Sequence, residues 1–426
     1  MTFTKRRAAR TVALLAAISI AAAVAPATST LGATKAKAKV KTTPATNFPT
    51  LKPPTGAVFT IGMTNTEGVP GLDFPDIRTY AQATANYLNK HGGLGGRKIK
   101  IETCVAKGSP ETSAACGQEL VGKKVDAILL GLDLFPPYAT YTAAGIPVFG
   151  TLPILPTDNT ANALFLGGGN ATSMAATAAA AKLHYKAKTV GIVAADNAGA
   201  NGTTAALQAS LDKAGIKYKT VKGGDNETDA GYQGLMREAA KDNPDLLISL
   251  YADAGCIGTI RGRAALGIKI PVLTTIICAG RNVRSVVGDD AIGWAFVAAQ
   301  TDKDTPEKAI IQAILAPQLK VAADKVDVGA LGLGTLGVQG MMWLAEHGNR
   351  LKAKGTKVVT GPALFSYMKT VKDTVVWPQG APMECGAVPK YSAFCAFSFP
   401  VGEYTKGGEN ITIPGLENLN VKEYLP

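Results

Sequence analysis

Residues 123–133 read KKVDAILLGLD, and residues 242–253, DNPDLLISLYAD, repeat their pattern. A second pair of stretches follows in the same order, because AAGIPVFGT at 143–151 corresponds to LGIKIPVLTT at 266–275. Each stretch contains a short apolar run bounded by turn-forming residues, which is typical of a strand buried in a parallel sheet. The repeated order predicts an internal duplication of strands and helices.

The surrounding segments alternate between predicted strands and helices. In the first half, the strand VFTIGM (58–63) precedes a helix with apolar residues at helical spacing from Ile77 to Leu88, and Asp73 is expected to cap it. A strand at 97–105 and a polar helix at 110–124 follow. The second half repeats this order from TVGIVAADN, at 189–197, onward. The pattern predicts an α/β fold of two Rossmann-like lobes with parallel sheets and a ligand cleft between them.

The positive charge of the chain is concentrated at its N-terminus. The 426 residues carry a formal charge of +12, and residues 1–54 contribute nine bases and no acid. Removing those nine leaves 35 bases against 32 acids in the other 372 residues. The part expected to fold is near neutral, which disfavours nucleic acid as a partner.

The N-terminal 33 residues are typical of a signal peptide. A basic stretch, KRRAAR, precedes the apolar run TVALLAAISIAAAVA, and cleavage is expected after Ala27 or Ala33. The alternative is a membrane anchor, but the run ends short of the roughly 20 apolar residues that a spanning helix needs. We therefore expect an exported protein, extracellular or in the periplasm or cell envelope. Residues 34–55 predict a Lys/Pro-rich tether, which either contacts anionic envelope components weakly or only solubilises the chain.

Six cysteines in an exported chain favour disulfides over a metal site. Their proximity in the sequence predicts the pairs Cys104–Cys116, Cys256–Cys278 and Cys385–Cys395. The three histidines, His91, His184 and His347, have no ligand partner nearby in the sequence and are expected at the surface or at helix ends. No metal and no cofactor are expected.

Several stretches together resemble the type I periplasmic solute-binding proteins of ABC importers, especially the branched-chain amino-acid and amide-binding branch. They are VFTIGM, ANYLNKHGGLGGRKIKIETC, KKVDAILLG and TAAGIPVFGT, together with the repeat of this order in the second half. The resemblance implies three crossings between lobes. It places the first lobe at 56–166 plus 300–375 and the second at 167–299 plus 376–426. Gly167, Gly168 and Gly169 would then form a hinge at the first crossing, or a simple loop before a helix.

Catalysis has no support in the sequence, so we expect no enzyme. Gly332, Gly334 and Gly337 match a dinucleotide-binding pattern, but no strand precedes them and no acidic residue lies at the required distance beyond. They are expected to form a loop that leads into a helix.

The candidate ligand-binding residues are those that follow predicted strand ends, where open parallel sheets bind ligands. The aromatic Tyr251 also matches a position at which the resembled family often has an aromatic residue. The first-lobe candidates are Asn65, Thr66, Glu67, Leu72, Phe74, Asp133, Leu134, Phe135, Thr151 and Leu152. The second-lobe candidates are Asp196, Asn197, Tyr251, Asp253, Thr275 and Cys278.

The expected ligand differs from that of the resembled amino-acid receptors. Those receptors hold the α-carboxylate with small hydroxyls and the α-ammonium with an acid, but the corresponding stretches here read Leu134-Phe135-Pro136-Pro137 and Thr275-Ile276-Ile277-Cys278. The predicted mouth carries acids and apolar residues without Lys or Arg, which favours a neutral or cationic, partly apolar small molecule.

Two functions remain open. The first is a receptor that captures a small molecule and delivers it to the membrane permease of an ABC importer. The alternative is a sensory or envelope-associated binding protein of the same fold without a transport role.

Overall fold

The computed structural model describes residues 52–69, 73–167, 169–298, 306–328, 331–372, 375–376, 381–406 and 409–426. The predicted signal peptide, most of the predicted tether, Leu72 and Gly168 lie outside these residues. Within the described residues, no helix is long and apolar enough to cross a membrane.

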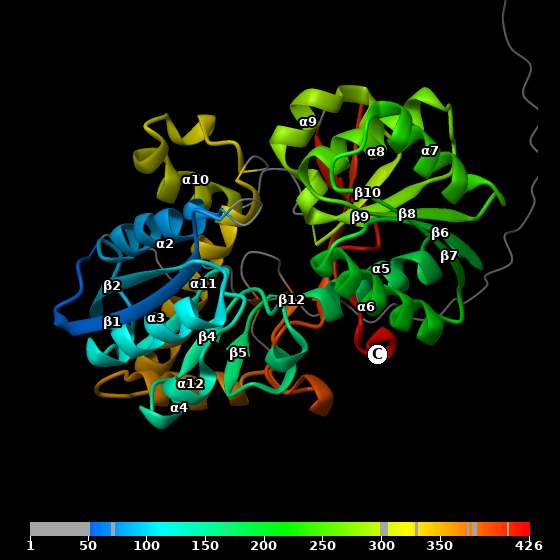
Figure 1. The fold of residues 1–426 in the computed structure, drawn as a ribbon. Helices are drawn as coiled ribbons and strands as arrows, with labels where there is room; N and C mark the ends of the chain where they lie inside the picture. Colours follow the sequence, from blue (N-terminus) through cyan, green and yellow to red (C-terminus); the bar gives the residue numbers. More distant parts are fainter. Residues whose placement is uncertain are drawn as a thin grey trace, which may run out of the picture. The chain divides into compact units, whose positions relative to one another are not determined.

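The first sheet has five parallel strands in the order β2-β1-β3-β4-β5 (Figure 1). They are β1 (Gly56–Thr66), β2 (Arg97–Ala106), β3 (Ala127–Leu130), β4 (Val148–Gly150) and β5 (Ala163–Phe165). Phe59, Ile61 and Met63 alternate along β1 and are fully buried. On the other face of β1, a Cβ on Gly62 would lie 3.3 Å from Leu120 Cδ1, in the helix that follows β2. Helices before and after β2 both contact β1, as the alternation of elements predicts.

Helices of two distant chain segments pack against this sheet. The segment between the strands supplies α2 (Pro75–Leu88), α3 (Pro110–Gly122) and α4 (Tyr138–Ala143). The later segment supplies α10 (Pro306–Leu319), α11 (Thr335–Ala353) and α12 (Gly361–Thr370), with α10 and α11 both packed on α2. The predicted helix cap is wrong in one detail. Phe74, not Asp73, precedes α2, and the Asp73 carboxylate accepts a hydrogen bond from Gly68 N at 2.8 Å in the preceding loop.

The second sheet has seven strands in the order β15-β14-β10-β9-β8-β6-β7. Five of them are parallel and repeat the first sheet: β6 (Thr189–Ala195), β7 (Lys217–Gly223), β8 (Leu246–Leu250), β9 (Val272–Thr275) and β10 (Trp294–Val297). The C-terminal strands β14 (Val401–Tyr404) and β15 (Asn410–Thr412) extend the sheet in antiparallel fashion. The duplication is thus confirmed, with an antiparallel edge added to the second copy.

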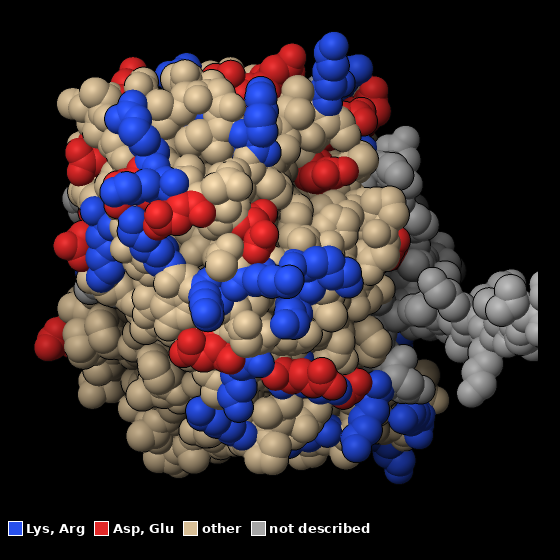
Figure 2. All heavy atoms as spheres, turned by 90° about the vertical axis from the view of Figure 1, so that its right-hand side faces the viewer, with Lys and Arg blue, Asp and Glu red and all other residues tan. Residues whose placement is uncertain are grey.

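The helices of the second lobe connect its parallel strands. They are α5 (Asn170–Leu183), α6 (Ala198–Ala214), α7 (Asp229–Ala240), α8 (Asp253–Ala265) and α9 (Arg281–Val287). The strand β7 is a sheet edge, and lysines on an edge strand discourage pairing with other chains. Two of these lysines have acidic partners, Lys219 with Glu238 at 2.6 Å and Lys222 with Asp196 at 3.8 Å. Figure 2 shows basic and acidic side chains interspersed on this side of the molecule.

Short elements complete the described chain. The 3₁₀ helices are η1 (Pro156–Thr160), η2 (Ile276–Ala279), η3 (Gly288–Ala291), η4 (Ala323–Lys325), η6 (Gly332–Gly334), η7 (Pro389–Tyr391) and η8 (Lys422–Tyr424). Two small antiparallel pairs join β11 (Val375–Val376) to β12 (Ala381–Pro382) and β13 (Ser398–Phe399) to β16 (Leu419–Asn420). As expected, the glycines at 332 and 334 belong to a short segment that leads into α11 rather than to a nucleotide-binding turn.

The lobe boundaries and the hinge stay predictions, although two observations bear on them. The boundary after Val376 assigned the following residues to the second lobe, yet Phe165 N of β5 donates to Ala393 O at 2.8 Å and Cys395 N donates to Phe165 O at 2.9 Å. In the segment expected to be a hinge, a Cβ on Gly167 would lie 2.0 Å from Thr151 O, and one on Gly169 would lie 1.5 Å from Pro153 O. A close backbone approach therefore accounts for these two glycines.

All three predicted disulfides are present: Cys104–Cys116, Cys256–Cys278 and Cys385–Cys395. The expectation for the histidines was wrong for His347, which is fully buried within α11 because its ring packs near Trp343 and Tyr367. His91 follows α2, and His184 ends α5.

Candidate ligand-binding site

The predicted ligand-binding residues of the first lobe lie at one edge of its sheet, because parallel strands end on the same side. Asn65 and Thr66 end β1, Asp133 follows β3, and Thr151 follows β4. The register places Thr64 of β1 beside Leu130 of β3, and Leu130 beside Gly150 of β4. Thr66 N donates to Leu132 O at 2.6 Å, which holds the end of β1 next to the loop carrying Asp133.

Asn65 and Glu67 are engaged within the protein. The Asn65 amide donates to Phe74 O at 2.8 Å and to Glu67 Oε1 at 3.1 Å, while its oxygen accepts from Leu132 N at 2.9 Å. Arg78 binds both oxygens of Glu67, at 2.7 and 2.9 Å. The hydrogen bond from Arg78 is the main reason that the pKa of Glu67 is lowered. The prediction of a mouth without Arg is therefore wrong at Glu67, whose charge is neutralised by a helical residue eleven positions later.

Other predicted residues at the same edge carry buried polar atoms without a hydrogen-bond partner in the described structure. These atoms are Thr66 Oγ1, Asp133 Oδ2 and Thr151 Oγ1. Their side chains are almost completely buried, with exposed fractions of 0%, 4% and 1%. Buried polar groups in folded proteins are normally hydrogen-bonded, so each such atom requires a water, an ion or a ligand.

The apolar candidates lie around this edge with different exposure. Phe74 and Leu152 pack against the hydrophobic core and are only partly buried. Leu134 is also partly buried, whereas Phe135 has 37% of its surface exposed. Phe135 is therefore the candidate that offers the most aromatic surface to a ligand.

In the second lobe, Tyr251 follows β8 and Thr275 ends β9. Tyr251 is only 3% exposed and packs edge-on against Tyr232, with ring centroids 5.6 Å apart. Burial is the main reason that its pKa is raised. The Tyr251 hydroxyl lies near the Gly223 backbone but makes no hydrogen bond of normal geometry. Thr275 Oγ1 is also buried without a hydrogen-bond partner. Cys278 is bonded to Cys256, so it braces this edge and offers no thiol.

The remaining second-lobe candidates are local structural residues or cannot be placed. Asn197 caps α6, because its side-chain oxygen accepts from Ala200 N at 2.8 Å, and its amide donates to Asp225 at 2.5 Å. Asp196 is exposed and accepts from Asn201 at 3.2 Å. Asp253 begins α8, but its side chain lies outside what the structure describes.

The two edges are linked through a contact between short segments. The 3₁₀ helix η2 begins directly after Thr275, and it contacts η6 at the start of α11. Farther along α11, a Cβ on Gly340 would lie 3.3 Å from Thr151 Cγ2. The continuous segment of η6 and α11 therefore lies close to the strand-end regions of both sheets.

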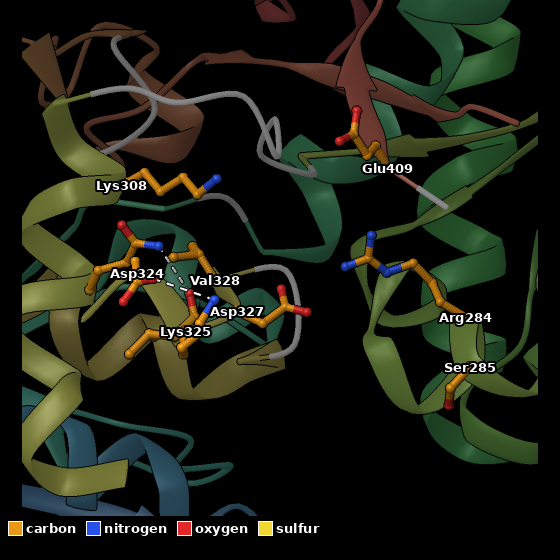
Figure 3. A pocket seen from close by; sticks show the side chains of 10 residues that line it. Arg284, Ser285, Lys308, Asp324, Lys325, Asp327, Val328 and Glu409 are labelled. Atoms are coloured by element: carbon orange, nitrogen blue, oxygen red, sulfur yellow. Dashed lines mark hydrogen bonds and ion pairs between the residues drawn. The ribbon is translucent and has the colours of Figure 1, made fainter. Parts of the chain in front are cut away.

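A separate cavity of about 570 Å³ has charged walls (Figure 3). Arg284 of α9 and Glu409, just before β15, lie on one side, while Lys308 of α10 and Asp327, after η4, lie on the other. None of the predicted ligand-binding residues is among its described lining. Sequence reasoning missed these residues because they lie on helices and turns rather than after strands of the repeat. Among the described residues, no cluster of His, Cys, Asp or Glu is arranged to hold a metal ion.

Comparison with solved structures shows the fold. An ABC transporter substrate-binding protein from Sphaerobacter thermophilus matches with a TM-score of 0.69 at 18% identity, over 86% of this chain and 100% of that one. A fatty acid ABC transporter substrate-binding protein from Thermomonospora curvata matches with a TM-score of 0.65 at 12% identity, over 88% and 97%. A solute-binding protein from R. palustris in complex with benzoate matches with a TM-score of 0.61 at 18% identity, over 85% and 97%.

No curated protein matches the sequence. The family model described as periplasmic binding protein matches residues 59–367, which run from β1 into α12 and include all the parallel strands of both sheets. With this match and the two sheets that repeat one topology, the chain belongs to the periplasmic binding protein family, in its type I form.

Proposed function

We propose that this protein captures a small extracellular molecule between its two lobes and delivers it to the membrane permease of an ABC importer. Family membership supports an exported receptor. Structural relatives named as transporter substrate-binding proteins support a role in uptake. The sensory role without transport is the competing function, and the two share the binding step.

The observation that carries the proposal is the position of the buried polar atoms without partners. Thr66, Asp133 and Thr151 place such atoms at the strand ends of the first sheet, and Tyr251 and Thr275 place them at those of the second. A hydroxyl or carboxylate left without a partner costs about 1–3 kcal/mol. At the two edges where parallel sheets bind ligands, such atoms can be satisfied by a ligand or by waters that a ligand displaces.

Binding would favour the arrangement in which both lobes contact the ligand. A ligand shifts a conformational equilibrium only by its difference in affinity for the two states. Because unpartnered atoms occur on both sheets, a molecule that reaches both gains hydrogen bonds that a separated arrangement does not offer. The family's two-lobed structure provides the means for this closure.

The experiment begins with the mature chain and a broad library of small solutes, screened by thermal shift and then by calorimetry. We expect at least one compound to bind with a dissociation constant in the micromolar range or below, and its complex to have a smaller radius of gyration in X-ray scattering. A screen without any binder, on protein shown to be folded, would contradict a receptor function.

A second step separates transport from sensing. Uptake of the labelled compound is measured in the source cells with the gene present, deleted and restored. Loss of uptake on deletion, recovered on restoration, supports delivery to an importer. Unchanged uptake alongside tight binding would favour the sensory or envelope-associated role.

A further inference from the structure

The loop after β3 contains a buried carboxylate with only one of its oxygens hydrogen-bonded. Asp133 Oδ1 accepts from Ser113 Oγ at 2.7 Å and from Phe135 N at 3.1 Å. Asp133 Oδ2 has no partner in the described structure, and the residue is only 4% exposed. No Lys or Arg of the described residues forms an ion pair with it at 4.0 Å or less. A buried charge in this situation requires a donor or a cation.

Two neighbouring hydroxyl groups are also buried without a partner. The Tyr141 hydroxyl of α4 is fully buried and has no partner, and neither does Thr66 Oγ1. Burial and then the charge of Asp133 raise the pKa of Tyr141, so the carboxylate and the phenol lie close enough to interact. Thr66 is held beside the loop by its hydrogen bond to Leu132. Two hydroxyl groups without partners thus lie in the region of the Asp133 carboxylate.

Two other carboxylates near this edge are fully satisfied. Arg78 binds both oxygens of Glu67. Asp158 accepts from the Tyr138 hydroxyl at 2.7 Å and from the backbone nitrogens of Ile154 and Leu155 at 2.6 and 2.8 Å. The fold therefore supplies donors to two acids of this region and leaves the third incomplete. Asp133 is the one that keeps an oxygen without a donor in the described structure.

We infer that Asp133 is the specificity-determining residue of the receptor and accepts hydrogen bonds from a positively charged amino group of the ligand. The inference rests on the proposed function, because it names the ligand class of the same site. Ser113 acts as a positioning residue, since it holds Oδ1 and leaves Oδ2 for the ligand. The exposed ring of Phe135, two residues later, offers apolar contact to the ligand body, so the ligand is an amine with a hydrocarbon part.

This assignment predicts a preference unlike that of some structural relatives. The relative from R. palustris is in complex with benzoate, and another is named for fatty acids. A carboxylate placed beside Asp133 Oδ2 would meet a like charge in a buried site, which is strongly unfavourable. The amino group instead replaces the missing donor. Because Oδ2 is buried in this structure, its surroundings must move to admit the ligand.

The test compares probes that share a skeleton and differ in one charged group. Benzylamine, benzyl alcohol and benzoate form one series, and isopentylamine, isopentanol and isovalerate form a second. Each is measured by calorimetry together with any binders from the broad solute screen. Within each series, we expect the amine to bind at least tenfold more tightly than the carboxylate. We expect the same for any amine found in the screen when it is compared with the carboxylate of the same skeleton. Tighter binding of carboxylates, or screened binders that all lack a basic nitrogen, would overturn the inference and leave the receptor function standing.

Variants then test the residue itself. Asp133→Asn should weaken amine binding at least tenfold and leave binding of the neutral alcohol within twofold, and Ser113→Ala should weaken amine binding about threefold. The matched control is Glu119→Gln on α3, which removes an equal charge from an exposed ion pair with Lys123 and should bind as the unmodified protein does. Equal amine affinity in folded Asp133→Asn and in the unmodified protein would contradict the assignment.

Two further measurements separate a ligand contact from other roles of Asp133. The melting temperature of ligand-free Asp133→Asn should not fall, because the new amide can donate a hydrogen bond to the neighbouring oxygens that lack partners. A large fall would indicate that Asp133 has a structural role. Thermal shifts in KCl, NaCl and choline chloride at equal ionic strength test for an inorganic ion. A stabilisation specific to potassium or sodium that disappears in Asp133→Asn would assign the space to that ion and overturn the amine.

Discussion

At the scale of single residues, position in the sequence identified the strand ends but not what each side chain does there. Thr66, Asp133 and Thr151 could be selected because they follow apolar strand segments. The pairing of Glu67 with Arg78 could not, because it depends on how the loop before α2 folds back on β1. The burial of Tyr251 could not be predicted either, because a residue after a strand can point into the core or toward solvent.

Tyr251 provides a prediction that separates packing from ligand contact. Tyr251→Ala removes a nearly buried ring that packs on Tyr232, so it should lower the free energy of unfolding by about 3–5 kcal/mol. Tyr251→Phe keeps the ring and removes only the hydroxyl, so stability should change by less than about 1 kcal/mol. Urea denaturation measures both values, and calorimetry with an identified ligand measures affinity. Undiminished affinity in Tyr251→Phe would exclude the hydroxyl as a contact.

His347 predicts a dependence of stability on pH. Burial, assisted by the charge of Arg350, lowers its pKa to about 4, while the Trp343 carbonyl acts in the opposite direction. Between about pH 6.5 and 4, the unfolded chain binds a proton that the folded chain does not, so the free energy of unfolding falls as the pH falls, by about 3 kcal/mol in total. Urea denaturation at pH 7 and pH 4.5 should show a smaller loss for His347→Gln. Equal losses would show that His347 does not cause the dependence.

At the scale of elements, the alternation of strands and helices was predictable because local periodicity and turns determine it. The antiparallel strands β14 and β15, and the bonds of residues 393 and 395 to β5, were not. The pairing of β14 with β10, and the bonds of residues 393 and 395, join chain segments more than 100 residues apart. No local pattern in the sequence indicates such a distant partner. The packing role of the glycines in α11 could not be predicted either, because it depends on which helix packs against them.

Gly337 provides the prediction for helix packing. A Cβ there would lie 2.0 Å from Ile77 O in α2, so Gly337→Ala must separate α11 from α2 and should destabilise the protein by about 1–3 kcal/mol or more. Gly202 in α6 is the matched control, since a Cβ there meets nothing within 4 Å and alanine favours a helix by about 1 kcal/mol. Thermal unfolding should therefore shift in opposite directions for the two variants. A neutral effect of Gly337→Ala would mean that the α2–α11 contact is looser than the structure shows.

At the scale of the whole molecule, the charges around the 570 Å³ cavity predict how closure depends on salt. Figure 3 shows Glu409 and Arg284 on one side, with Lys308 and Asp327 on the other. Ligand binding that brings these sides together moves Arg284 toward Asp327; both residues are partly buried, and ion pairs near the surface each contribute about 0.2–1 kcal/mol. Arg284→Glu should therefore weaken ligand binding up to about fivefold at low salt, and less at 0.5 M NaCl because salt screens exposed charges.

Adding Asp327→Arg should restore part of the affinity by reversing the pair. Calorimetry of the two single variants and the double variant measures this coupling. Additive effects in the double variant, or losses that do not depend on salt, would show that these two charges do not approach one another when the ligand binds.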